Sequence, residues 1–330
     1  MSGHTLEMDS RHRYWCTNPE HKEADCAGVI FESVTTILGK AVPKNLAWYG
    51  QTRGVIGVKG LLRIPKYDVR AMKPGEVGQA CAAEGIGITP AGTNTTALAV
   101  RLSAIPKYDV GKLSPDAITD ALKREKLTVN DHRDQAAEGG TAVHNALEEY
   151  IKRGIIPSAA KVPEAKRASI RGLAKFIIDY RPEFIASEVK TVSTAHGYAG
   201  TFDFLANIHA RLDKVSRWER NGGGAMKTKD AKLVLVPDPN STLTALVDLK
   251  TSKYVYPTSH FPQLEAYEGA RIEAGEPPTD VRAVLWVNNE GEMDLVPSSA
   301  SFEDFLALKR SAEVLGRLDK SWTRPRKARA

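Results

Sequence analysis

Cysteine and long hydrophobic runs are both scarce in this sequence, and each shortage excludes a class of protein. Three cysteines in 330 residues are an odd and sparse set, which excludes the disulfide framework of a small secreted protein. No apolar run approaches the roughly 18 residues that span a bilayer. The first residues also lack the apolar core of a signal peptide. We therefore expect a cytoplasmic chain without a membrane partner.

Basic residues exceed acidic residues by only a small number. Lysine and arginine number 46 against 40 aspartates and glutamates, which gives a formal charge of +6 and a pI near 9.0. Such a mild excess favours an anionic partner such as nucleic acid but does not establish one. With 42% hydrophobic and 26% charged residues, the chain has the composition of a globular protein. Its length suits one catalytic-sized domain with an accessory region.

Residues 1–135 are predicted to form a mostly helical N-terminal accessory region that begins with a hairpin. The hairpin covers His12 to Ile30, Ser33 caps a helix that begins VTTILG, and a further helix begins at Pro43. Residues 70–97 are rich in glycine, threonine and alanine with little periodicity, and are predicted to form a loop.

The hexapeptide IPKYDV occurs twice, at Ile64–Val69 and again 41 residues later at Ile105–Val110. Two copies are too few to build a solenoid. We interpret the repeat as a local duplication that lengthened one loop. The alternative is a pair of functional motifs.

The pattern of residues 136–300 predicts an α/β (α+β) core with a small central mixed sheet flanked by helices. Helical periodicity alternates there with short apolar strands, which is typical of that fold class. A closing helix and a basic tail are expected over residues 301–330. The predicted helices cover residues 114–124, 131–154, 163–180, 263–274 and 302–319, and the predicted strands cover 184–193, 198–208, 244–252, 281–287 and 292–297.

The break between the second and third core strands, Arg211 to Lys232, is rich in lysine and arginine and contains Asn221 followed by three glycines. One interpretation is a solvated flexible loop. The alternative is a basic flap that springs from beside the active centre and closes over a phosphate backbone.

Candidate catalytic residues lie in three core segments. Asp248 and Lys250 are two residues apart in the apolar strand TALVDLKTS, so their side chains share one face. An acid two residues before a lysine occurs five times in the chain, so neighbouring motifs must decide which pair is functional. The preceding strand contains GTFD, in which Asp203 offers a hard oxygen ligand. The helix before it contains GTAVH, which ends at His144.

Taken in this order, GTAVH, GTFD, DLK and QLEAY resemble the motifs of the PD-(D/E)XK nuclease superfamily. The resemblance is closer to the RecB-type branch, which includes phage exonucleases and the nucleases of CRISPR adaptation. It covers roughly residues 138–270 and implies a restriction-endonuclease-like core. It also implies a divalent metal, Mg²⁺ or Mn²⁺, at the active site.

The resemblance assigns a role to each matched residue. The implied metal ligands are His144, Asp203, Asp248 and the carbonyl oxygen of Leu249. The resemblance implies that Lys250 is the catalytic lysine. It also implies that Glu188, on the first strand, is an additional acidic catalytic residue. Gln263 and Tyr267, on the helix after the DLK strand, are the implied substrate-binding residues on the DNA side.

These roles predict a divalent-metal-dependent deoxyribonuclease, an exonuclease that hydrolyses phosphodiester bonds in DNA recombination, replication or repair. The alternatives are an endonuclease of the same fold and a non-catalytic DNA-binding scaffold. DNA is the expected partner, with a recombination or replication protein as a further one.

The placement of cysteine departs from that of several relatives, which hold an iron–sulfur cluster with three cysteines after the nuclease core. No cysteine follows Cys81 in this chain, so no iron–sulfur cluster is expected. Cys16, His21 and Cys26 would need a fourth ligand such as His12 to bind zinc, and their spacing fits no common zinc pattern. An unliganded hairpin is the favoured interpretation, and zinc binding is the alternative.

Overall fold

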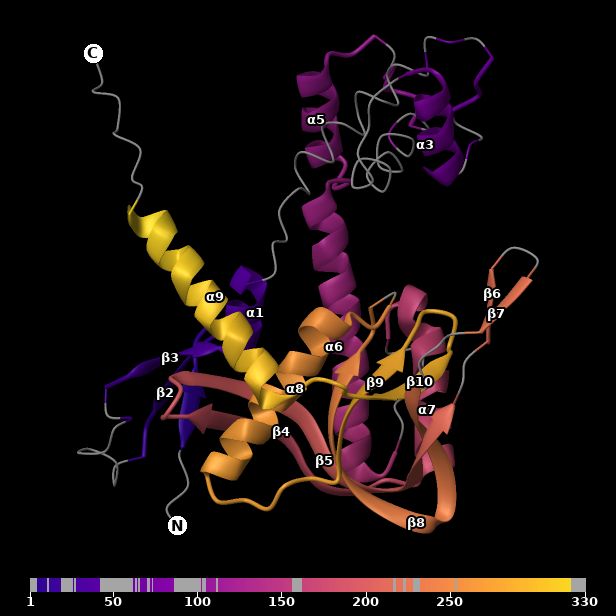
Figure 1. Cartoon of the computed structure of the whole chain (residues 1–330). Coiled ribbons are helices and arrows are strands. Elements are labelled where there is room, and N and C mark those ends of the chain that lie inside the picture. Colours follow the sequence, from indigo (N-terminus) through magenta and orange to yellow (C-terminus); the bar gives the residue numbers. More distant parts are fainter. Residues whose placement is uncertain are drawn as a thin grey trace. The chain divides into compact units, whose positions relative to one another are not determined.

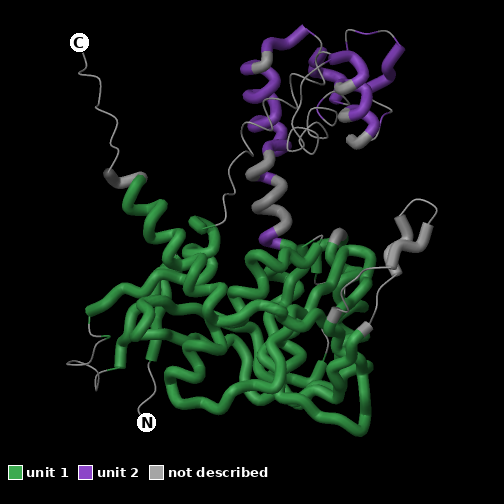
Figure 2. The backbone as a smooth tube through the Cα atoms, in the orientation of Figure 1, with its two compact units in different colours: residues 1–43, 139–330 green, residues 44–138 purple. Residues whose placement is uncertain are grey.

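The computed structural model divides the chain into two compact units (Figure 2). Unit 1 comprises residues 1–43 and 139–330, and unit 2 comprises residues 44–138. The accessory region predicted over residues 1–135 is thus divided, because strands from residues 1–43 extend the sheet of unit 1. The structure describes residues 5–10, 12–18, 26, 28–41, parts of 62–85, 102, 105–110, 112–155, 162–215, 218–221, 224–227, 232–252 and 254–321.

Unit 1 is built on a mixed sheet with eight described strands, larger than the small sheet that the sequence suggested (Figure 1). Its order is β1 (Leu6–Met8), β2 (Arg13–Cys16), β3 (Ile30–Ser33), β5 (Tyr198–Val215), β8 (Lys232–Lys250), β9 (Val281–Val287) and β10 (Met293–Pro297), and β4 (Glu183–Ser193) also pairs with β5. The β3–β5 and β8–β9 pairs are parallel, and the other pairs are antiparallel. The predicted α/β class with a mixed central sheet is confirmed.

Helices cover both faces of this sheet through two apolar clusters. Successive residues of β8 alternate between the clusters, since Val247 belongs to one and Leu246 to the other. The Val247 cluster includes residues of α6 (Val129–Arg153) and α7 (Arg167–Tyr180), which follows the short helix η3 (Glu164–Lys166). The Leu246 cluster includes residues of α1 (Val34–Ala41), α8 (Pro257–Glu273) and α9 (Phe302–Ser321).

Two predicted helix starts are confirmed by their capping bonds. The Thr36 N–H donates to Ser33 Oγ at 3.1 Å at the start of α1. The Ala117 N–H likewise donates to Ser114 Oγ at 3.1 Å, where α5 (Pro115–Arg124) begins. The helix expected from Pro43 and the tail 322–330 lie outside the described residues. None of the described helices is both long enough and apolar enough to span a membrane.

Unit 2 contains a tandem duplication that is longer than the hexapeptide. The Tyr67 hydroxyl donates to Glu84 at 2.9 Å, and 41 residues later the Tyr108 hydroxyl donates to Glu125 at 2.7 Å. In each copy the lysine before the tyrosine forms an ion pair with the same glutamate. The helices α3 (Pro74–Ala83) and α5 are also 41 residues apart.

The apolar residues of the two copies pack into one cluster and occupy matching positions. Val69, Val77 and Cys81 of the first copy correspond to Val110, Ile118 and Leu122 of the second, and all six are buried. The loop predicted over residues 70–97 is therefore wrong where α3 forms, because the glycines and small residues of PGEVGQACAA hide its helical periodicity. The repeat is a duplicated turn-and-helix unit rather than a lengthened loop.

The break predicted between two core strands is largely β structure. The β5–β8 ladder continues to Val215 opposite Lys232, and β6 (Trp218–Asn221) pairs with β7 (Gly224–Lys227) beyond it. Arg211 follows Asp203 by eight residues along β5, about 26 Å in an extended strand. Arg211 also contacts Asp213 and Asp238. The flap hypothesis requires this segment to begin beside the candidate active site. The segment begins far along β5 from Asp203, so the hypothesis is wrong on this point.

Candidate active site

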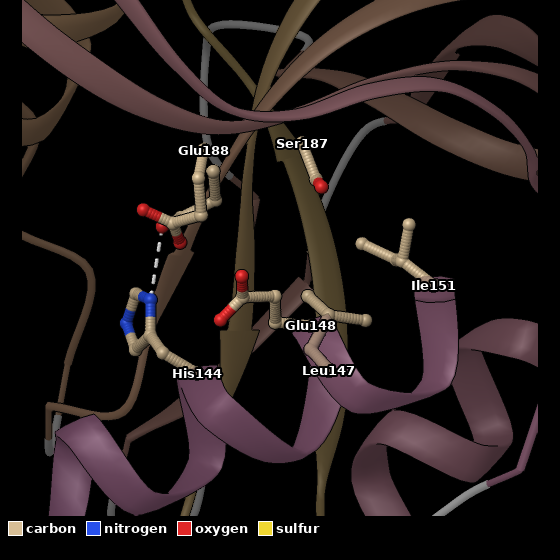
Figure 3. Close-up of a pocket in the computed structure, with 7 residues that line it drawn as sticks. His144, Leu147, Glu148, Ile151, Ser187 and Glu188 are labelled. Atoms are coloured by element: carbon tan, nitrogen blue, oxygen red, sulfur yellow. Dashed lines mark hydrogen bonds and ion pairs between the residues drawn. The ribbon is translucent and has the colours of Figure 1, made fainter. Parts of the chain in front are cut away.

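Three elements of unit 1 bring one histidine and two carboxylates together. His144 comes from α6, Glu188 from β4 and Asp203 from β5, and one ligand atom of each lies within 4.8 Å of the others. Among the described residues, no other group of histidine, cysteine, aspartate and glutamate side chains is placed this closely for metal binding. Figure 3 shows His144 and Glu148 rising from α6 toward the strand that carries Glu188. This arrangement could hold a cation.

An irregularity in the sheet places the two carboxylates side by side. The pairs Ser187–Phe204 and Val189–Phe202 flank Glu188 and Asp203 on β4 and β5. Phe202 belongs to the cluster beneath α8 and Phe204 to the cluster beneath α7, so the alternation of β5 breaks at Asp203. Glu188 has a φ of 51°, a conformation that costs a non-glycine residue roughly 1 kcal/mol. Such strain is typical of functional sites.

Both oxygens of Asp203 are held by neighbouring groups. Oδ1 lies 2.9 Å from His144 Nδ1, and Oδ2 accepts a hydrogen bond from the Leu249 N–H at 2.5 Å. The second bond connects β5 to β8 at Leu249, the residue between Asp248 and Lys250. The structure therefore shows the Leu249 N–H in contact with the site, and the Leu249 carbonyl oxygen as a metal ligand stays a prediction.

Asp248 and Lys250 form an ion pair beside this group. Their side chains are 4% and 22% exposed, so the pair is largely removed from water. The ammonium contacts Asp248 Oδ2 without hydrogen-bond geometry, and this buried oxygen has no hydrogen-bond donor among the described residues. The ion pair with Lys250 is therefore the contact that compensates for burial of this oxygen.

Burial and neighbouring charges together set the pKa values of Asp203, Asp248 and Lys250. Burial raises the pKa of Asp203, but His144, Lys250 and the Leu249 N–H outweigh it, so this pKa lies below its ordinary value. Burial, with the Asp203 carboxylate, raises the pKa of Asp248 in spite of Lys250. Burial lowers the pKa of Lys250, but Asp248 and Asp203 raise it above its ordinary value. Lys250 therefore stays positively charged.

Negative charge is crowded around Glu188. Burial, followed by the Asp203 carboxylate, raises the pKa of Glu188, and His144 opposes the rise. Burial lowers the pKa of His144, but Asp203 more than compensates and raises it above its ordinary value. Ionised carboxylates that burial and neighbours disfavour are stabilised by a nearby cation.

The two residues predicted to face DNA are buried and bonded to each other. Gln263 Nε2 donates to the Tyr267 hydroxyl at 2.6 Å, and the residues are 6% and 2% exposed. The Tyr267 ring occupies the space beside Gly200, where an added Cβ would lie 2.4 Å from Tyr267 Cε1. The glycine of GTFD thus permits α8 to pack closely on β5, and DNA contact by Gln263 and Tyr267 stays a prediction.

Lys166 supports the site and was missed by the sequence analysis. It is 6% exposed, and its Nζ donates to the Thr251 carbonyl oxygen at 2.9 Å, directly after the DLK strand. Its aliphatic stem fills the space beside Gly139, where an added Cβ would lie 3.0 Å from two stem carbons. No sequence signal marks it, because a lysine at the start of a helix is usually exposed.

The structure thus regroups the predicted site residues. His144 and Asp203 lie together as predicted, and Glu188, which the resemblance implied only as an additional acid, completes the group. Asp248 lies beside Lys250, as their spacing predicted, and its role as a metal ligand stays a prediction. The structure does not decide between an unliganded hairpin and zinc binding by Cys16, His21 and Cys26, because His21 lies outside the described residues.

No model of a protein family matches the chain, and no curated protein matches it in sequence. The case for a function therefore rests on the order of the motifs and on the geometry of the site.

Proposed function

We propose that the protein is a divalent-metal-dependent deoxyribonuclease, an exonuclease that degrades DNA. The observation that carries the proposal is the meeting of His144, Glu188 and Asp203 within 4.8 Å of one another, beside the Asp248–Lys250 ion pair. The order of the four motifs along the chain gives independent support, because each of them lies on the kind of element that the resemblance requires.

The residues of the site fit Mg²⁺ or Mn²⁺. Carboxylate oxygens are ligands for Mg²⁺, and an imidazole nitrogen is acceptable to Mn²⁺. Burial and the Asp203 carboxylate raise the pKa of Glu188, and a cation would relieve this repulsion. Asp248 contacts Lys250 through Oδ2, so its other carboxylate oxygen, Oδ1, would be the one to offer to a metal. His144, Glu188 and Asp203 would hold the metal.

The side chains of the site divide the chemical work. A bound metal would supply Lewis-acid polarisation of the scissile phosphate and lower the pKa of a bound water. Lys250 keeps its charge and would stabilise the negative charge that builds on the phosphate oxygens. Asp248 fixes the position of that ammonium. Asp203, held at both oxygens, keeps His144 oriented.

Cleavage assays on linear and circular DNA test the proposal. We expect the purified chain to degrade linear DNA when Mg²⁺ or Mn²⁺ is present and to leave covalently closed circles intact. Nicking or cutting of circles would instead identify an endonuclease of the same site. Absence of cleavage with both metals on both substrates would refute the proposed activity.

Two substitutions connect the activity to the site. Asp203→Asn and Lys250→Ala should each lower the cleavage rate by about 10³-fold or more, because each removes transition-state stabilisation. Calorimetric titration with Mn²⁺ should separate them, since only Asp203→Asn removes a ligand. Glu149→Gln on the same helix is the matched control, because Glu149 pairs with Arg153 outside the site. Near-parent turnover of Asp203→Asn would show that the site is wrongly assigned.

A further inference from the structure

Two exposed tyrosines follow the candidate active site in sequence. Tyr254 is 58% exposed and Tyr256 is 49% exposed, and no other aromatic side chain that the structure describes is exposed. Both lie in the linker of residues 251–256, which joins β8 to α8. Large aromatic groups are normally covered, so an exposed pair in a single linker suggests a surface for a ligand.

The residue between them shows that the pair faces outward. Val255 packs against the apolar cluster beneath α8. Tyr256 has an extended backbone, with φ −106° and ψ 92°. Val255 thus packs inward, whereas the tyrosines on either side of it are exposed.

The start of the linker is fixed by two buried or half-buried side chains. Lys166 Nζ donates to the Thr251 carbonyl oxygen at 2.9 Å, and Trp286 Nε1 donates to the Ser252 carbonyl oxygen at 2.8 Å. Both donors belong to other elements of unit 1, so two consecutive carbonyl groups are held from outside the linker.

The end of the linker is fixed by the first turn of α8. The Tyr256 N–H donates to His260 Nδ1 at 3.2 Å, and the two rings meet edge to face with centroids 5.5 Å apart. The Ser259 hydroxyl donates to the Tyr256 carbonyl oxygen at 3.3 Å. The backbone is therefore held at Thr251, Ser252 and Tyr256 before any ligand binds, which lowers the entropy that binding must overcome.

The tyrosines are also close to the reacting groups. Tyr254 follows Lys250 by four residues, which limits the separation of their Cα atoms to about 14 Å. His260, which contacts the Tyr256 ring, lies near enough to Lys250 for the charge of the ammonium to lower the pKa of the imidazole. A nucleotide whose phosphate reaches Lys250 thus has neighbours along its strand within reach of the linker.

We infer that Tyr254 and Tyr256 form a stacking platform for unpaired bases of the DNA strand beside the scissile phosphate. This inference rests on the proposed function and specifies its substrate. Stacking on aromatic rings accepts every base, because every base has a π-face. Bases inside a duplex already stack on their neighbours, so the platform favours a single strand, or a duplex end with unpaired nucleotides, over a blunt duplex.

Binding measured without cleavage tests the platform. Fluorescence anisotropy would compare a labelled single strand with the matching blunt duplex in EDTA, which removes divalent metal. Tyr254→Ala and Tyr256→Ala should each weaken single-strand binding by roughly ten-fold, as loss of one base–aromatic stack does. Duplex binding should change by less than about two-fold. Tyr254→Phe and Tyr256→Phe keep the ring and should bind as the parent does.

The controls separate this inference from the proposed function. Leu315→Ala removes another exposed apolar side chain, on α9, and should change neither affinity. Circular dichroism should show that all variants fold, since both tyrosines are exposed. Equal losses for single strand and duplex would overturn the inference, as would parent-like affinity of both alanine variants. Either result leaves the proposed nuclease activity standing, because that activity is measured separately, by cleavage of DNA with metal.

Discussion

The contact between Gly200 and Tyr267 provides a quantitative test of how the site is built. An alanine at position 200 would place its Cβ 2.4 Å from Tyr267 Cε1 and 3.2 Å from Cδ1. The ring cannot easily move away, because Tyr267 is buried, holds a hydrogen bond from Gln263 at 2.6 Å and lies beside Phe202. Gly200→Ala therefore forces α8 and β5 apart.

The structure sets the expected size of this effect. Overpacking of a dense core costs about 1–3 kcal/mol of unfolding free energy, and Tyr267→Ala alone should cost about 3–5 kcal/mol. If the ring is the obstacle, the clash vanishes when both changes are combined. The double variant should then be more stable than the sum of the single effects predicts, by about 1–3 kcal/mol.

Urea unfolding followed by circular dichroism measures all four proteins of this cycle. Gly316→Ala is a matched control with the same chemical change, because nothing lies within 4 Å of an added Cβ there. It replaces glycine inside α9 and should stabilise the protein by up to about 1 kcal/mol. An unchanged midpoint for Gly200→Ala, or additive effects within about 0.5 kcal/mol in the cycle, would refute the close-packing argument.

Two further predictions concern other parts of the chain. Burial, with the charge of Lys250, lowers the pKa of His260 to about 4 from 6.5. The neutral ring therefore contributes stability that is complete above pH 6.5 and decreases by up to about 3 kcal/mol as the pH falls toward 4. Urea unfolding of His260→Gln should show a weaker loss between these pH values, and an equal loss would contradict the argument. In unit 2, Tyr67→Phe and Tyr108→Phe should lower its thermal midpoint by similar amounts, since each removes the equivalent hydrogen bond. A loss confined to one copy would show that the copies are not equivalent.

The strand and helix patterns near the site could be predicted because they are strong and local. The apolar alternation of TALVDLKTS indicated a buried strand, and Ser33 and Ser114 indicated helix starts that their capping bonds confirm. The resemblance of four short motifs then selected His144 and Asp203, which the structure brings together. These signals depend only on residues that are close in sequence.

The remaining features depend on contacts between distant residues. The left-handed backbone of Glu188 and the break in alternation at Asp203 arise from pairing of β4 with β5, and neither leaves a mark in the local sequence. The strands β5 and β8 extend past the predicted ends because the two segments pair with each other, from Ala210 opposite Pro237 to Val215 opposite Lys232. Lys166 supports Thr251 across 85 residues, which no pattern of spacing reveals.

The parallel pairing of β3 with β5 has a consequence for synthesis of the protein. Glu32 pairs with Tyr198, which the ribosome adds 166 residues later. At about 5–20 residues per second, this delay lasts roughly 10 to 30 seconds. During that time unit 2 is completely synthesised, whereas β2 and β3 present an unpaired edge to other chains. Nascent chains are therefore most vulnerable to aggregation in this interval, and chaperones that bind N-terminal segments should increase the yield of folded protein.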